Sequence, residues 1–169
     1  MDVFDAVRTV LAVREFRRDP LPAEVVRKIA RAARLTASSQ NGQPWHFVMV
    51  TDRDTLQRVG ELARTGHYIA QAPLAVAVAI DKESRFGVSD ASRAIQDMAL
   101  TAWGEGVGSN WVGFGGLDEI KPVLGIPDNL ELLAIVPFGY PAHPHKGNQK
   151  KRKPMGEVVS LNRYGRPYA

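Results

Sequence analysis

The 169-residue sequence predicts an α+β or α/β fold in which helices cover a central sheet. Segments with helical spacing alternate with short β-rich runs along the chain. Residues 73–80, PLAVAVAI, are apolar on both faces of an expected strand, which is typical of a strand in the middle of a covered sheet. Residues 90–104 have a broad apolar surface at helical spacing, as a central packed helix does. We expect a single domain that spans residues 1–169.

The N-terminal segment predicts two helices separated by a pair of prolines. Asp2 can cap the first helix, which must end before Pro20 and Pro22. The apolar residues of this helix fall on one face: Val3, Val7, Val10 and Leu11. Pro22 suits the first turn of the second helix. The residues expected to face inward there are Val26, Ile29, Ala30 and Ala33, and those of an outer face that we interpret as solvated are Arg27, Arg31 and Arg34.

The chain then alternates strands and helices as far as Pro141. Residues 36–45 are rich in Ser, Asn, Gly and Pro, which indicates a loop. The elements expected after this loop are strands at 46–51, 73–80, 109–114 and 131–141, and helices at 54–63, 90–104 and 119–124. After Pro141 the chain turns polar and shows no apolar period, so it cannot build a core by itself. We expect this tail to be disordered or to wrap on another surface.

Composition excludes several classes of protein. The chain has no cysteine, which excludes disulfides and thiolate metal sites. Its longest apolar run, residues 72–80, is too short to span a bilayer, and the N-terminus lacks the basic-then-apolar layout of a signal peptide. We therefore expect a cytoplasmic protein with no membrane partner. The net charge is +4, and residues 150–153 alone carry four positive charges.

Familiar catalytic patterns are absent from the sequence. Of the four histidines only His143 and His145 are close together, and no carboxylate lies near them, so we expect no metal site. There is no G-x-S-x-G elbow to mark a nucleophile. The glycine-rich residues 104–116 do not match G-x-G-x-x-G and follow a helix instead of a strand. They indicate either a tight helix-to-strand turn or backbone whose N–H groups face a flat ligand.

The basic stretch GNQKKRKP at residues 147–154 needs an anion. Nucleic-acid binding would require a broad basic face and usually aromatic residues, and only Tyr164 and Tyr168 lie nearby. We therefore expect no nucleic-acid partner. Two interpretations stay open at this point: a solvated cluster, or capture of a phosphate by a Lys–Arg pair.

Several separated stretches resemble the flavin-dependent nitroreductase family, over roughly residues 2–166. The strongest is SSQNGQPWHF (38–47), which looks like the family's Ser-x-x-Asn-x-Gln-Pro-Trp loop leading into a strand. The supporting stretches are GVGSNWVG (106–113), GIP (125–127), FGYP (138–141), the K-x-R-x-P tail and NRYG (162–165). Each stretch is weak alone, but their order and spacing make the resemblance specific.

This resemblance implies an α+β fold with a central mixed sheet covered by helices, built as an intertwined homodimer. It implies that residues 142–169 form an arm on the partner subunit, and that FMN lies in two pockets at the interface. The implied activity is that of an FMN-dependent NAD(P)H oxidoreductase. NADH or NADPH would reduce the flavin and leave, after which a flat, electron-poor acceptor such as a nitro compound or a quinone would take the electrons. Because the cofactor carries this chemistry, no catalytic protein residue is expected.

The resemblance also implies site residues. Ser38 and Ser39 would approach the flavin from the partner subunit, and Gln43 would hold their loop. The N–H groups of Gly113, Phe114 and Gly115 would face the hydride-accepting edge of the flavin. The remaining assignments are Arg14 at the flavin's pyrimidine rim, Lys150 and Arg152 at the FMN phosphate, and His67 and Tyr68 on the acceptor side.

One stretch departs from the family pattern. Family members usually begin with an Arg-Arg-Ser-x-Arg-like stretch that grips the phosphate and ribityl chain, but this chain has Val10, Leu11 and Ala12 there and retains only Arg14. The missing hydrogen bonds, at roughly 1–3 kcal/mol each, would weaken FMN binding by orders of magnitude unless the tail compensates. The alternative is therefore a non-catalytic or weakly catalytic protein of the same fold that binds a flavin or deazaflavin.

Overall fold

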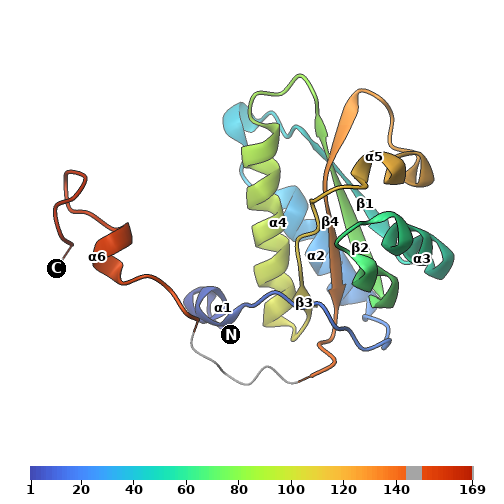
Figure 1. Cartoon of the computed structure of the whole chain (residues 1–169), viewed down its shortest axis with the longest axis horizontal. Coiled ribbons are helices and arrows are strands. Elements are labelled where there is room, and N and C mark those ends of the chain that lie inside the picture. The colour runs from blue at the N-terminus through green and yellow to red at the C-terminus, as the bar shows by residue number, and fades with distance from the viewer. Residues whose placement is uncertain (144–149, 169) are drawn as a thin grey trace.

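A four-stranded sheet forms the centre of the fold (Figure 1). The computed structural model describes residues 1–143 and 150–168. The strands are β1 (Trp45–Val50), β2 (Leu74–Asp81), β3 (Gly108–Ser109) and β4 (Leu130–Gly139). Their order in the sheet is β1–β2–β4–β3, which places the apolar β2 between two neighbours and confirms it as an inner strand. The expected α+β class is confirmed.

The sheet is antiparallel rather than mixed. All three neighbouring strand pairs are antiparallel, and within the described residues the parallel pairing is an isolated bridge between Ala12 and Ser109. Each strand begins beside the end of its neighbour: Val50 pairs with Ala75, and Asp81 pairs with Leu130. The intervening helices therefore return the chain to the end from which it left. A parallel pair would need a crossover to the opposite end.

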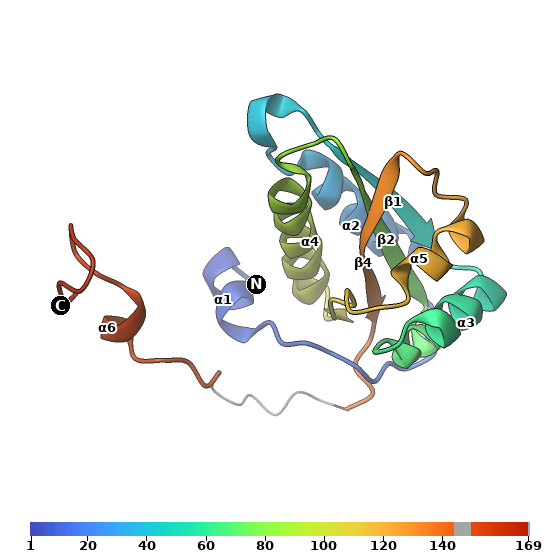
Figure 2. The same ribbon diagram turned by 45° about the horizontal axis from the view of Figure 1, so that its top comes forward.

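The two faces of the sheet bury different apolar clusters. On β2 the large side chains point to one face, and the alanines at 75, 77 and 79 point to the other, because successive side chains of a strand alternate. The first face is covered by α2 (Ala23–Leu35) and α4 (Gly87–Gly104). The second is covered by α3 (Arg53–Leu62), η2 (His67–Gln71), α5 (Leu117–Ile120) and η3 (Pro122–Leu124). Both layers are visible in Figure 2.

Most expected elements occur close to their expected places. The helix expected at 90–104 begins three residues earlier, at Gly87. The strand expected at 109–114 is wrong, because β3 holds two residues and the chain then pairs again only at Val112. In α2 the buried residues are Val25, Ile29 and Ala33, with Val26 and Ala30 only half-buried. The expectations did not include η1 (Ser39–Asn41) or η2.

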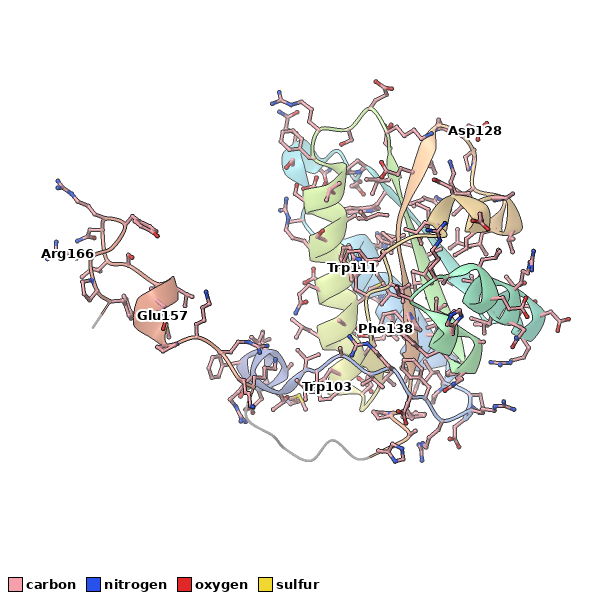
Figure 3. All side chains as sticks on the ribbon, in the orientation of Figure 1. Trp103, Trp111, Asp128, Phe138, Glu157 and Arg166 are labelled. Atoms are coloured by element: carbon pink, nitrogen blue, oxygen red, sulfur yellow. The ribbon has the colours of Figure 1, made fainter. Side chains whose placement is uncertain are left out.

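The first helix, α1 (Val3–Thr9), is shorter than expected. The Asp2 side chain caps it by accepting the Asp5 N–H at 2.8 Å, as expected. The helix ends at Thr9, so Val10 and Leu11 do not extend its apolar face. That face is also not inward in this chain, because Val3 is 78% exposed and Phe4 is 73% exposed. α1 is attached by its end, where the Trp103 Nε1–H of α4 donates to Thr9 Oγ1 at 2.9 Å (Figure 3).

The C-terminal residues 150–168 extend away from the sheet, beyond α1 (Figures 1 and 2). They contain one short helix, α6 (Met155–Val158), which sequence reasoning missed. Glu157 and Arg166 mark how far this segment lies from the body of the molecule (Figure 3). Its apolar side chains are largely exposed, among them Met155, Val158, Leu161 and Tyr164. Within residues 1–143 and 150–168, no helix is long and apolar enough to cross a membrane.

Candidate functional site

Arg14 lies on a segment that runs along the edge of the sheet. The Val13 N–H donates to the Ser109 carbonyl oxygen at 2.9 Å, which fixes this segment beside β3. Gly108 permits the contact, because a Cβ there would overlap the Val13 side chain. Val13 and Phe16 are buried while Arg14 is exposed, and its guanidinium has no partner in the described part of the chain. Arg14 is therefore a free cation next to β3.

The two predicted acceptor-side residues, His67 and Tyr68, lie in η2. The Tyr68 hydroxyl contacts the Asn110 side-chain amide, and its ring centroid lies 6.4 Å from that of Phe16, so the tyrosine joins the segment that carries Arg14 to the one that carries Asn110. The His67 ring nitrogen Nδ1 lies 3.1 Å from the Gly60 carbonyl oxygen. Because a carbonyl can only accept, Nδ1 carries a proton in this contact. The Arg53 guanidinium donates to the carbonyl oxygens of Ala70 and Ala72, which holds η2 in place.

The glycine loop, residues Gly113–Gly116, follows directly. Val112 exchanges two backbone hydrogen bonds with Ile135 at 2.9 Å each, and the chain then leaves the sheet. Gly115 and Gly116 both have φ +80°, a conformation that only glycine adopts readily. A Cβ at Gly116 would clash with the Leu62 carbonyl oxygen, and one at Gly115 would lie 2.9 Å from Arg64 Cδ. Phe114 is 78% exposed.

The backbone N–H groups of the glycine loop are free. Among the described residues, none of the N–H groups at 113–116 donates to a protein acceptor. These donors follow Asn110 in sequence, and the Asn110 side-chain amide contacts Tyr68. They are the kind of unpaired backbone group that a ligand with an acceptor edge satisfies. That this backbone faces a flat ligand stays a prediction.

Of the predicted phosphate pair, Lys150 lies at the C-terminal end of α1. Its ammonium donates to the Val7 carbonyl oxygen at 2.7 Å, one turn before Val10. Partial burial and the neighbouring Arg152 guanidinium hold the pKa of Lys150 below its usual value. Arg152 itself donates to the Lys151 carbonyl oxygen at 2.9 Å. The two cations thus stand close to the segment where the sequence lacks polar phosphate ligands, while residues 147–149 of the basic stretch lie outside the described residues.

Ser38, Ser39 and Gln43 lie at the other end of α4. The Ser39 N–H donates to the Asp90 side chain at 2.9 Å, and Asp90 is in the first turn of α4. The segment that carries Arg14 instead adjoins the opposite end of α4, where Trp103 contacts Thr9 and Val13 bonds to Ser109. The glycine loop follows Val112, which pairs with Ile135 in the middle of β4. Residues 90 and 103 are separated by about 20 Å along a helix axis. One chain therefore does not bring the Ser38–Gln43 loop to Arg14.

The comparisons with known proteins decide the family. The Nitroreductase family model matches residues 8–82 and 65–140 of the chain. The chain belongs to the nitroreductase family. It is 33% identical over 150 residues to a Methanothermobacter thermautotrophicus protein provisionally named NADH dehydrogenase/NAD(P)H nitroreductase, covering 84% of this chain and 78% of the relative.

Solved structures of the family share the fold. A Bacteroides thetaiotaomicron protein with the same provisional name is 26% identical, with a TM-score of 0.87 over 96% of this chain and 98% of its own. An FMN-dependent nitroreductase from Clostridium difficile R20291 is 24% identical, with a TM-score of 0.88 over 95% and 99% of the two chains. The nitroreductase fold is therefore present over nearly the whole chain.

A pocket of about 630 Å³ adjoins the Ser38 end of this nitroreductase domain. Its walls come from η1, from the start of β1, from the turn before α4 and from the start of β4. The residues that give it polar and aromatic character are Gln40, Gln43, His46, Arg85, Phe86 and Asp90. Of these six, only Gln43 was predicted from the sequence as a site residue. Arg85 and Phe86 gave no signal, because a short turn between a strand and a helix does not show that it faces the Ser38 loop.

Asn110 and Arg64 are further residues that sequence reasoning missed. Asn110 lies inside the quoted stretch GVGSNWVG, so its polar side chain among apolar neighbours was a usable signal. Arg64 gave none, because only the fold brings it against Gly115. The described residues contain no group of three or more side chains that could hold a metal. His143 pairs with Glu15 at 3.1 Å, while His145 lies outside the described residues.

Proposed function

We propose that this nitroreductase-family protein is an FMN-dependent NAD(P)H oxidoreductase that passes electrons in two steps to a flat, electron-poor acceptor. The observation that carries the proposal is the glycine loop, whose N–H groups donate to no acceptor among the described residues and which follows Asn110, whose side-chain amide contacts Tyr68. Family membership and the names of the relatives support the reaction class. When bound, FMN would supply the redox chemistry, taking electrons from NADH or NADPH and giving them to a nitro compound, a quinone or a similar molecule.

The residues of this chain fit such a cofactor at its ring. The N–H groups of Gly113, Phe114 and Gly115 would donate to the acceptor atoms along the ring edge, and the missing side chains of the glycines leave room for close approach. Arg14 would place a positive charge where negative charge develops on a reduced ring. His67 and Tyr68 would line the acceptor side, with the tyrosine offering an aromatic face for a flat molecule.

The phosphate end of the cofactor would depend on the tail. Val10 and Leu11 are half-buried and Ala12 is exposed, and none of their side chains can donate a hydrogen bond. Lys150 is a tail cation that contacts the end of α1 through the Val7 carbonyl oxygen, Arg152 is close enough to lower its pKa, and a Lys–Arg pair suits a phosphate monoester. We therefore assign the phosphate to Lys150 and Arg152.

We further propose that the working protein is a homodimer, with residues 142–169 lying on the partner subunit. The separation of the Ser38–Gln43 loop from Arg14 by the length of α4 supports this assembly, since a second copy can bring its Ser38–Gln43 loop to the Arg14 of the first. The apolar side chains that α1 and the C-terminal segment leave exposed support it as well, because solvent-exposed apolar patches of this kind mark contact surfaces. Each site would then contain residues of both chains.

The purified protein tests the proposal directly. We expect visible flavin absorption bands, or a thermal shift and bands on titration with FMN, followed by steady NADH or NADPH oxidation with a quinone or nitroaromatic acceptor. A colourless protein that gains neither bands nor a thermal shift with FMN would contradict it. Flavin binding without any NAD(P)H oxidation would favour the alternative, a non-catalytic binding protein, which the apolar Val10–Ala12 segment motivates.

A further inference from the structure

The Ser38–Gln43 loop is held in an uncommon backbone conformation. Gln40, Asn41 and Gln43 have φ values of 54°, 55° and 48°, in the left-handed region that residues with a side chain rarely occupy. Each such residue is conformationally strained and persists only where its surroundings fix it. Three of them within six residues require a strong anchor.

Asp90 is that anchor. Its side chain is 0% exposed, yet it is a carboxylate, and a buried charge is stable only when hydrogen-bonded and paired. One carboxylate oxygen accepts the Ser39 N–H at 2.9 Å, and the other accepts the Ser39 hydroxyl at 3.3 Å. Arg93, one turn further along α4, pairs with the second oxygen. Both oxygens of Asp90 are therefore committed, and two of the three donors belong to Ser39.

The same contacts give Ser38 and Ser39 different roles. A carboxylate can only accept, so the Ser39 hydroxyl must donate its proton to Asp90 and cannot donate it to a ligand. The Ser38 oxygen instead accepts the Gln43 N–H at 3.0 Å, and its own proton remains free to donate. Asp90 also lines the pocket that this loop borders. Movement of the loop would therefore change both the pocket and the direction of the Ser38 hydroxyl.

We infer that Asp90 is a positioning residue, which fixes the Ser38–Gln43 loop through Ser39 so that Ser38 presents its hydroxyl to the ligand. The ligand part rests on the proposed function, whereas the anchoring part does not. Asp97 of the same helix provides a matched control, because its exposed carboxylate accepts the Thr36 hydroxyl at 2.7 Å and does not contact the loop.

Hydrogen exchange at the Ser39 amide, measured by NMR on the full chain without added flavin, tests the anchor. We expect Asp90→Asn to exchange at least tenfold faster at Ser39 and Gln43 with amides of β2 and β4 unchanged, and Asp97→Asn to leave Ser39 unchanged. Equal exchange at Ser39 in both variants, or acceleration throughout the sheet in Asp90→Asn, overturns the inference. Should Asp90→Asn not fold, Ser39→Ala replaces it, because this variant removes only the hydroxyl and we expect about threefold faster exchange at its own amide.

FMN titration tests the consequence for the ligand. We expect the Kd for FMN to rise about tenfold in Asp90→Asn and in Ser38→Ala, and to stay within twofold of the wild type in Asp97→Asn. An unchanged Kd in Asp90→Asn, together with faster Ser39 exchange, would show that the anchor serves the loop alone and overturns the positioning role. A wild-type protein that binds no FMN refutes the proposed function instead, and the exchange experiment still decides the anchor.

Discussion

The Ser38–Gln43 loop and the glycine loop both contain left-handed backbone, but they fill it with different residues. In the first loop Gln40, Asn41 and Gln43 occupy these positions, and in the second Gly115 and Gly116 do. Glycine adopts the conformation at little steric cost, whereas the other residues are strained there. Hydrogen bonds therefore hold the first loop in its left-handed conformation, whereas the glycines of the second loop adopt this conformation without strain.

The hydrogen bonds of the two loops differ in the same way. In the first, the N–H groups of Ser39, Asn41, Gly42 and Gln43 all donate within the chain. In the second, the N–H groups at 113–116 donate to no acceptor among the described residues. A loop whose N–H groups are mostly paired within the chain offers a ligand chiefly its side chains, such as the Ser38 hydroxyl. A glycine loop can offer its backbone.

The largest expected effect concerns the glycine loop itself. Gly116→Ala places a methyl group against the Leu62 carbonyl oxygen at a φ of +80°, so it combines a clash with an unfavourable backbone conformation. We expect it to lower the free energy of unfolding by about 3 kcal/mol or more, because the cost of the backbone conformation adds to the cost of overpacking. That loss corresponds to a Tm about 6–12 °C lower in a domain of this size, measured by thermal denaturation.

Gly125→Ala separates the two causes of this loss. Gly125 has φ +64°, and a Cβ there meets nothing within 4 Å, so only the backbone conformation is unfavourable. We expect a loss of about 1–2 kcal/mol. An equal Tm change in the two variants would show that the clash with Leu62 contributes nothing, and that the glycine loop is not fixed by close packing on α3.

Much of the fold could be predicted from the sequence because its signals are local. The apolar alternation of β2 and the helical spacing of α4 depend only on which residues follow one another. The direction of strand pairing and the exposed face of α1 could not be predicted. Both depend on where distant segments return, and an apolar helix face gives the same pattern whether its own chain or a second chain covers it.

The site was predictable in parts for a related reason. Stretches of sequence rich in Gly, Ser and Asn predicted both the Ser38–Gln43 loop and the glycine loop. Asp90 could not be recognised, since an acidic residue near the start of a helix ordinarily caps it or interacts with its dipole. Only the fold shows that its carboxylate is buried and directed at Ser39. Long-range partners of this kind leave no spacing in the sequence.

A second prediction concerns the charge that neither loop supplies. Residues 38–43 and 113–116 contain no cation, so a phosphorylated ligand needs one from elsewhere. We expect the double variant Lys150→Ala and Arg152→Ala to raise the Kd for FMN about 100-fold, because two charge-assisted hydrogen bonds are lost. Fluorescence titration of FMN measures the change.

Lys151 and Lys153 are the matched controls for this pair. They are exposed and lie in the same basic stretch, so Lys151→Ala and Lys153→Ala change the net charge by the same amount per residue. We expect each to change the Kd by less than threefold. Comparable effects from all four lysine and arginine positions would mean that the stretch acts as a diffuse positive charge, and the assignment of the phosphate would fail.

The smallest expected effect is a gain in stability, opposite in sign to the loss expected for Gly116→Ala. Gln40 is strained at φ 54°, and its side chain makes no hydrogen bond within the described residues. Gln40→Gly removes the strain but increases the entropy of the unfolded chain, so we expect a net gain of about 0.5 kcal/mol and a Tm about 1–2 °C higher. Gln96→Gly, at an exposed position in α4, is the control and should cost about 1 kcal/mol. If both variants lose stability equally, the backbone of the Ser38–Gln43 loop is not strained at Gln40. The loop would then adopt this conformation even without its hydrogen bonds to Asp90.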